Sequence, residues 1–129
     1  MKLVNFLVGD NVRLGVKVEN GILDLKKAAT DLDFSVPEKI EEVISGGQNM
    51  LEKLNKLTKQ ETCIIPEKEV VFAPCITKPE KIICIGLNYL DHANESNMDI
   101  PTSPVVFSKF NNALAAHQQE ILLPLNAKQ

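Results

Sequence analysis

The sequence is poor in aromatic residues and in histidine. Its 129 residues include no tryptophan, one tyrosine and two histidines, so any chemistry depends on few groups. The three cysteines, Cys63, Cys75 and Cys84, are odd in number and form no C-x-x-C pair. This arrangement suits neither a disulfide framework nor a zinc knuckle, and it fits a reducing compartment.

Long apolar runs and an excess of positive charge are also missing. No run approaches the ~20 residues that a membrane-spanning helix needs, and the apolar start of the chain is too short for the core of a signal peptide. Fourteen Lys and Arg against 17 Asp and Glu give a net charge of -3, whereas a nucleic-acid partner calls for clustered positive charge. We therefore expect a cytoplasmic protein that binds neither membranes nor nucleic acid.

The first part of the chain has the pattern of a small β-meander. Residues 2–8 and 12–18 are rich in β-branched and apolar residues and flank Gly9-Asp10-Asn11, which predicts a hairpin. Asn20-Gly21 then predicts a second turn, and a short strand follows at Ile22–Asp24.

Two helices are expected next. Ser35 and Glu38 have the spacing of a capping box, and Gly46-Gly47 predicts the end of the first helix. A second helix is predicted over residues 48–58. The two helices should bury apolar residues on one side, namely Ile40, Val43, Ile44, Met50, Leu51, Leu54 and Leu57.

The segment 73–80 is the best candidate for a domain boundary. Residues 1–75 hold no histidine and no obvious polar cluster, which predicts a scaffold domain, and residues 76–129 would begin a second domain. In that second part, residues 81–86 are apolar apart from Lys81, as in a strand buried on both faces. The segment ends at Gly86, where loops commonly present functional groups.

His92 and Glu95 are the first candidate for chemistry. On a helical turn, residues three apart share a face. A carboxylate that hydrogen-bonds one imidazole nitrogen fixes the tautomer, and the other nitrogen can then take a proton from water. Asp91 could cap this turn. The same H-x-x-E spacing is also common in solvated surface pairs, so from the residues alone both readings stay open.

Lys109 and His117 are weaker candidates. Alternation along Val105–Phe110 places Lys109 on one face with Val105 and Phe107. There it would either extend its ammonium group to water or hold an anionic substrate. His117 lies in a polar loop, and its spacing from His92 and Glu95 gives little support to a shared metal site.

Residues 81–124 resemble the fumarylacetoacetate hydrolase family. Lys81–Tyr89, followed by Asp91-His92 and Glu95, resembles the family signature K-I-[IV]-C-[VI]-G-x-N-Y-x-D-H-x-x-E. Val105–Lys109 resembles its P-V-x-F-x-K strand, and Ile121–Pro124 resembles its next strand. The first 75 residues look like the smaller N-terminal domain of many members.

The resemblance implies an α+β protein in which the small β-meander and helices precede the first strands of a mixed β-roll. It implies a metal-dependent hydrolase, decarboxylase or isomerase of small 2-oxo or 1,3-dicarbonyl acids, usually dimeric and holding Mg²⁺, Mn²⁺ or Ca²⁺. His92 and Glu95 would activate water, and Asn88, Tyr89 and Lys109 would bind the dicarboxylate or oxo-acid substrate.

Some positions depart from the family pattern. Leu90 stands where many members have arginine, and Phe110 replaces a common proline. The Glu-x-Glu metal motif of the family is expected beyond Gln129, so we expect no metal in this chain, little or no activity of the chain alone, and an incomplete β-roll.

Two other readings remain at this point. The chain could be an interaction module that pairs with a full-length family member, since unpaired strand edges favour strand exchange or homo-oligomers. It could also be a small-ligand domain that uses His92 and Lys109 without catalysis.

Overall fold

The computed structural model describes residues 1–30, 35–60 and 62–124. The chain divides into two compact units, Met1–Thr77 with Ala115–Gln129, and Lys78–Leu114. The boundary between the two units at Thr77 lies inside the segment 73–80 that the sequence suggested. The predicted domain limits, 1–75 and 76–129, stay a prediction.

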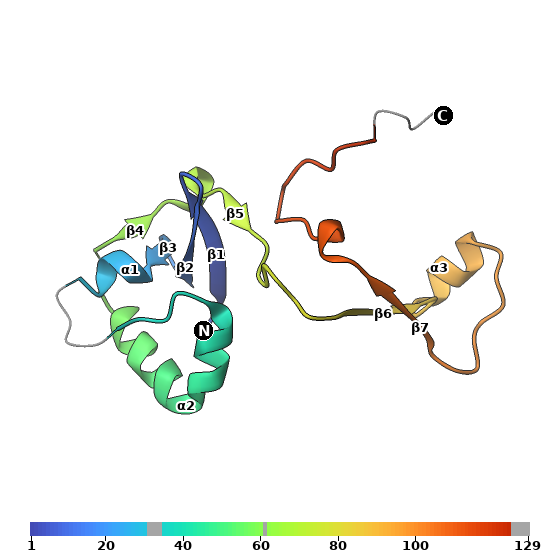
Figure 1. The fold of residues 1–129 in the computed structure, drawn as a ribbon, viewed down its shortest axis with the longest axis horizontal. Helices are drawn as coiled ribbons and strands as arrows, with labels where there is room; N and C mark the ends of the chain where they lie inside the picture. The colour runs from blue at the N-terminus through green and yellow to red at the C-terminus, as the bar shows by residue number, and fades with distance from the viewer. Residues whose placement is uncertain (31–34, 61, 125–129) are drawn as a thin grey trace. The chain divides into compact units, whose positions relative to one another are not determined.

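The first unit is built on an antiparallel sheet with strand order β4-β3-β2-β1-β5 (Figure 1). The predicted hairpin and third strand are confirmed as β1 (Leu3–Val8), β2 (Asn11–Val18) and β3 (Gly21–Asp24). β1 pairs with β2 from Leu3↔Val16 to Val8↔Asn11. The two edge strands are short, β4 (Ile64–Ile65) on β3 and β5 (Phe72–Ala73) on β1, with a 3-10 turn at Glu67–Glu69 between them.

Two helices cover the core of this sheet. α1 (Leu25–Ala28) was not predicted; it begins because Asp24 ends β3 and its side chain then accepts a hydrogen bond from the backbone N–H of Lys27 at 3.2 Å. α2 (Ile40–Leu57) is the longer helix. The core joins the sheet to both helices through Leu14, Val16, Leu23, Leu25, Ala28, Val43, Leu54 and Leu57.

The predicted start of α2 is wrong. The helix begins at Ile40 after an extended Lys39, and Ser35 provides no cap. The backbone N–H of Glu38 instead donates to the carboxylate of Glu42 at 2.9 Å, so a residue inside the helix satisfies the group that a capping box would have satisfied. Ile44, predicted in the core, is 68% exposed because it lies outside the stripe that contains Val43.

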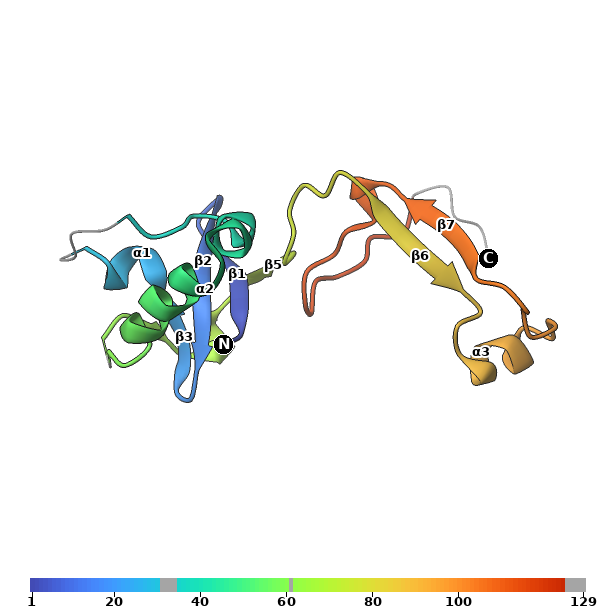
Figure 2. The same ribbon diagram turned by 90° about the horizontal axis from the view of Figure 1, so that it is seen from below.

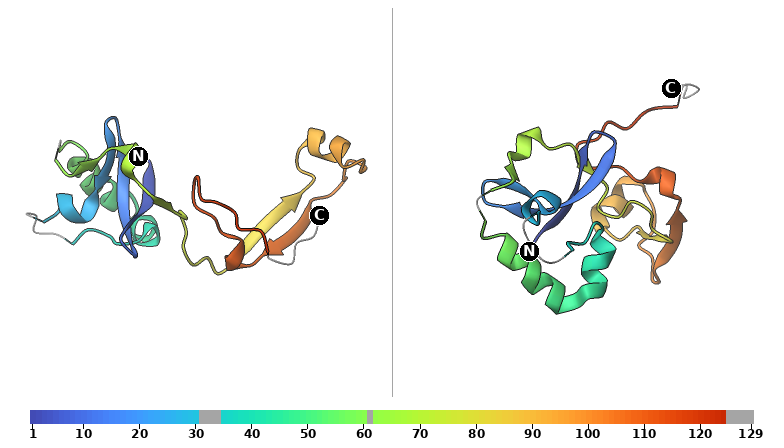
Figure 3. Two further views of the ribbon diagram at one scale, coloured as in Figure 1. Left: turned by 90° about the horizontal axis from the view of Figure 1, so that it is seen from above. Right: turned by 60° about the vertical axis from the view of Figure 1, so that its left-hand side comes forward.

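The predicted interruption at Gly46-Gly47 is confirmed as a kink. Gly47 has φ 54° and ψ -146° inside α2, and the bend is visible in Figure 1 and Figure 3. Because glycine has no Cβ, it adopts this conformation where other residues are strained.

The second unit contains an antiparallel ribbon of two strands, β6 (Ile82–Gly86) and β7 (Val105–Lys109). A short helix, α3 (Leu90–Glu95), follows β6, and a 3-10 turn at Asn111–Ala113 follows β7 (Figure 2). The α+β class predicted from the sequence, with an antiparallel meander and few helices, is confirmed.

Two strand predictions in the second part are wrong. β6 is not buried on both faces, since Ile83 is 65% and Ile85 46% exposed, and every residue of β7 is exposed. A ribbon of two strands has no second layer of its own to cover its faces. Ile121–Leu123 forms no strand, because none of the described strands pairs with it, and its three side chains are each more than 80% exposed.

Candidate functional site

The turn between β6 and α3 carries most of the predicted site residues. β6 ends at Gly86, and Leu87 has a φ of 50°, a left-handed conformation that costs a non-glycine residue about 1–2 kcal/mol. Tyr89 then provides the extended residue before α3, and its carbonyl accepts a hydrogen bond from Ala93 N at 3.2 Å. Three residues, Leu87–Tyr89, thus connect the end of β6 to the start of α3.

α3 places His92 and Glu95 on one face. Three helical steps leave their side-chain directions about 60° apart, and both residues are exposed. Ala93, between them, is 1% exposed and forms the buried side of the helix. No hydrogen bond or ion pair joins His92 to Glu95 in the structure. Asp91 lies inside the first turn and does not cap it.

A hollow of about 330 Å³ opens beside this turn. Asn88 is the predicted site residue that lines it, and Tyr89, which is 75% exposed, does not. The opposite wall is the loop before β7, where Thr102 and Ser103 contribute hydroxyl groups. No charged side chain lines the hollow, which suits the uncharged part of a ligand. The sequence analysis did not identify these two hydroxyl residues. The flanking prolines, Pro101 and Pro104, were the only sequence feature that marked this loop.

Lys109 lies at the other end of the ribbon from α3. It pairs with Ile82, whereas Val105 pairs with Gly86, so four residues separate its Cα from the turn, about 13 Å along the strand. Val105, Phe107 and Lys109 share one face as predicted. The Lys109 ammonium lies 5.6 Å from the centre of the Phe107 ring, a cation–π distance. The structure therefore does not gather Lys109 with His92 and Glu95.

The metal that the family resemblance implies does not fit the residues present. No group of three or more His, Cys, Asp or Glu side chains among the described residues is arranged to hold an ion, and hard divalent ions need several oxygen ligands. His117, a weak candidate ligand, belongs to the first unit, where its ring meets Phe72 edge-on at 5.6 Å between centroids.

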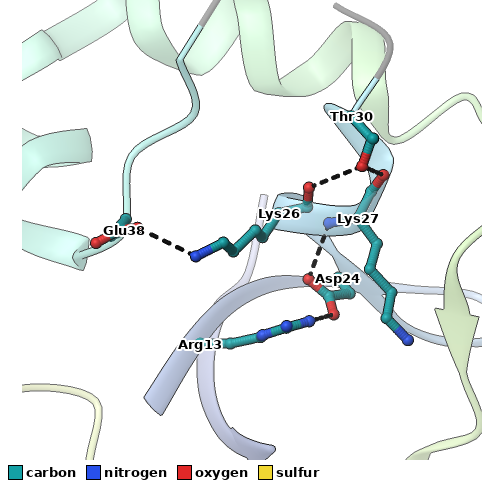
Figure 4. Close-up of polar contacts among 6 residues, drawn as sticks. All are labelled: Arg13, Asp24, Lys26, Lys27, Thr30 and Glu38. Carbon is teal, nitrogen blue, oxygen red and sulfur yellow. Dashed lines mark hydrogen bonds and ion pairs between the residues drawn. The ribbon is translucent and has the colours of Figure 1, made fainter. Parts of the chain in front are cut away.

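A polar cluster in the first unit was missed from the sequence. Asp24 is 0% exposed and accepts a hydrogen bond from the guanidinium of Arg13 at 2.6 Å, as well as that from Lys27 N (Figure 4). The only sequence signal was the unpaired charge of Asp24 at the end of an apolar strand. The expectation that residues 1–75 hold no polar cluster is therefore wrong.

The sequence matches known proteins along its whole length. Residues 81–129 match the family model described as fumarylacetoacetate (FAA) hydrolase C-terminal. The mitochondrial oxaloacetate tautomerase Fahd2a of Rattus norvegicus is 31% identical over 133 residues, covering 100% of this chain and 41% of its own. The fumarylacetoacetate hydrolase domain-containing protein 2 homolog of Dictyostelium discoideum is 38% identical over 138 residues, covering 100% of this chain and 42% of its own.

A solved structure shares the fold. The structure of a protein assigned as HpcE from Mycobacterium smegmatis superposes with a TM-score of 0.65 and 24% identity, over 97% of this chain and 41% of that one. The chain thus spans about two fifths of the length of the relatives it matches. The resemblance read from residues 81–124 is confirmed. In the part of the chain that the structure describes, no helix is long and apolar enough to cross a membrane.

Proposed function

We propose that this chain, which carries fumarylacetoacetate hydrolase sequence over residues 81–129, is part of an enzyme that acts on small 2-oxo or 1,3-dicarbonyl acids. The observation that carries the proposal is the strand–turn–helix module that ends in His92 and Glu95. It presents a base and a carboxylate on one open face of α3, and the first residue of that helix, Leu90, lines the uncharged hollow. Several relatives are named oxaloacetate tautomerases, which favours isomerisation over hydrolysis and decarboxylation.

His92 is the group that moves the proton in this proposal. Its neutral imidazole takes a proton from the enol oxygen of the substrate and a protonated imidazole returns one to the neighbouring carbon, so the keto–enol exchange gains and loses no atoms. Glu95 would hold the imidazole in the required tautomer by a side-chain rotation, since the two residues already share a helical face. In hydrolysis the same imidazole would take its proton from water.

The other predicted residues would bind the substrate. Asn88 lines the hollow, and its amide would donate to a carbonyl or carboxylate oxygen. The exposed Tyr89 beside it would contact the substrate. Lys109, at the far end of the ribbon, would balance the negative charge of the substrate at longer range. A divalent ion, Mg²⁺, Mn²⁺ or Ca²⁺, is proposed for the whole protein with ligands outside the described residues, and the proton transfer by His92 does not run through it.

The test is the rate of enol-to-keto conversion of oxaloacetate by the whole protein, followed by the loss of enol absorbance. His92→Gln should lower kcat by about 10²- to 10⁴-fold, and Glu95→Gln should lower it less because it removes only the orienting group. His117→Gln is the matched control and should leave kcat within twofold. A His92→Gln variant with an unchanged rate would contradict the proposal. The 129-residue chain alone, assayed in parallel, is expected to be inactive.

A second candidate is an interaction module that pairs with another copy or with a full-length relative. The observation that favours it is one apolar face of the ribbon, where Ile83, Ile85 and Val106 are 65%, 46% and 62% exposed. Contiguous apolar surface of this kind commonly marks a protein interface.

All three cysteines are free, which fits a reducing compartment. The cytoplasm stays a prediction, and the relatives from rat and humans are named as mitochondrial.

A further inference from the structure

A second hollow, of about 590 Å³, lies entirely within the first unit. Its walls come from the tip of the β1–β2 hairpin, from α1 and from the segment Ser35–Glu38 before α2. The volume is in the range of about 300–1,000 Å³ that small-molecule sites occupy. The proposed function uses none of these residues.

The lining of this hollow combines apolar walls with a few charged groups. The apolar side chains are those of Val8, Val12, Leu14, Ala29, Val36 and Pro37. Among the described lining residues, Arg13 and Lys26 are cationic and Glu38 is anionic. The accessible lining is more polar than apolar, so a ligand would meet the charged and polar groups over most of its surface and the apolar side chains over the rest.

Arg13 is ordered by a buried carboxylate. Its guanidinium donates to Asp24 at 2.6 Å, and Asp24 is itself fixed by Lys27 N and fully buried. One of the five N–H donors of the guanidinium is used in this way, and none of the described residues accepts from the others. The side chain of Arg13 is 25% exposed. An arginine that a buried carboxylate has already ordered loses little entropy when it binds an anion.

Lys26 is the more weakly held of the two cations. Its ammonium lies 3.5 Å from the Glu38 carboxylate, and the two side chains are 64% and 73% exposed. Exposed ion pairs of this length contribute little, so a ligand can displace Glu38. Figure 4 shows Lys26 extending toward Glu38, whereas Lys27, the next residue, extends to the other side of α1.

We propose that this hollow binds a small organic carboxylate. The carboxylate would take the place of Glu38 at Lys26 and accept hydrogen bonds from Arg13, and its apolar body would lie against Leu14, Val36 and their neighbours. Arg13 has N–H donors beyond the one that it gives to Asp24, and the exposed Lys26 can leave Glu38, which favours an anionic over a cationic ligand. The apolar walls argue against a bare inorganic anion, which would gain nothing from them.

Benzoate titrated into the 129-residue chain tests the site, with binding followed by NMR shifts of the amides of residues 8–14, 26–29 and 35–38. Benzyl alcohol is the uncharged probe of the same shape, and inorganic phosphate is the bare anion. Saturable shifts with benzoate, at least about tenfold stronger than with either of the others, are expected because only benzoate uses both the charged and the apolar walls. Equal binding of benzyl alcohol would overturn the role of the cations, and equal binding of phosphate would overturn that of the apolar walls.

Three single variants locate the site. Lys26→Met should weaken benzoate binding about tenfold, since it removes one charged contact, and Lys27→Met, the matched control, should leave it unchanged. Glu38→Gln should strengthen it by removing the competing carboxylate. The folded state of each variant is checked by its β1–β3 amide signals. An equal loss in both lysine variants, or weaker binding by Glu38→Gln, would contradict the proposal.

Discussion

Asp24 shows how one side chain can serve two purposes in the first unit. Its two carboxylate oxygens accept from different partners, Oδ1 from the backbone of Lys27 and Oδ2 from Arg13. The first contact starts α1 and the second neutralises a charge that is buried completely. A buried carboxylate is tolerated only when it is paired and hydrogen-bonded in this way.

Replacement of Asp24 should therefore separate these two contributions. Asp24→Ala removes both and leaves the largely buried Arg13 unpaired, so the free energy of unfolding should fall by about 3 kcal/mol. Asp24→Asn retains an oxygen for Lys27 N and should cost less. Urea unfolding followed by circular dichroism measures both values. Equal losses in the two variants would show that the helix cap contributes nothing.

α2 illustrates the element scale, because its two halves are joined by one residue in a non-helical conformation. A Cβ added at Gly47 would meet no atom within 4 Å, so space does not require glycine there. The requirement comes from φ 54° and ψ -146°, which an L-residue adopts only with strain. The kink lets α2 bury Val43 before it and both Leu54 and Leu57 after it.

Gly47→Ala is expected to destabilise the protein by about 1–3 kcal/mol through backbone strain alone. Gln48→Ala, the next position along the exposed side of the helix, is the control and should change stability by less than about 0.5 kcal/mol. Thermal unfolding of both variants provides the comparison. If Gly47→Ala proves as stable as Gln48→Ala, the helix can straighten without cost and the kink is not required by the core.

At the scale of the whole molecule, the two units differ in how much they bury. The first unit has a contiguous core under its sheet. In the second unit, Lys78–Leu114, only Ala93 is a buried hydrophobic residue. Hydrogen-exchange protection depends on such burial, so the amides of β6 and β7 should exchange much faster than those of β1–β3 in dilute protein.

Exchange measured at several protein concentrations tests whether the ribbon pairs with another copy. Association protects the residues that it covers by mass action, so protection of β6 and β7 should rise at least about tenfold across a hundredfold increase in concentration. The β1–β3 amides provide the internal reference, and Val106→Lys, which places a charge on the exposed face, should abolish the rise. Protection that does not change with concentration would rule out self-pairing through the ribbon.

The sequence by itself determined the features that depend on neighbouring residues. Alternation and turn residues were enough to predict β1–β3, and the paired glycines were enough to predict the interruption of α2. The spacing of His92 and Glu95 predicted a shared helical face, and the order of motifs in residues 81–124 predicted the similarity to the fumarylacetoacetate hydrolase family. Each of these follows from local conformational preference or from a pattern confined to a short stretch.

Tertiary structure alone decided the features that depend on distant partners. Arg13 meets Asp24 only because β2 and β3 are adjacent in the sheet. The exposure of β6 could not be read from its apolar sequence, because burial depends on whether another layer covers the strand. Ile121–Leu123 failed as a strand for the same reason: a strand needs hydrogen-bonding partners that its own residues cannot supply.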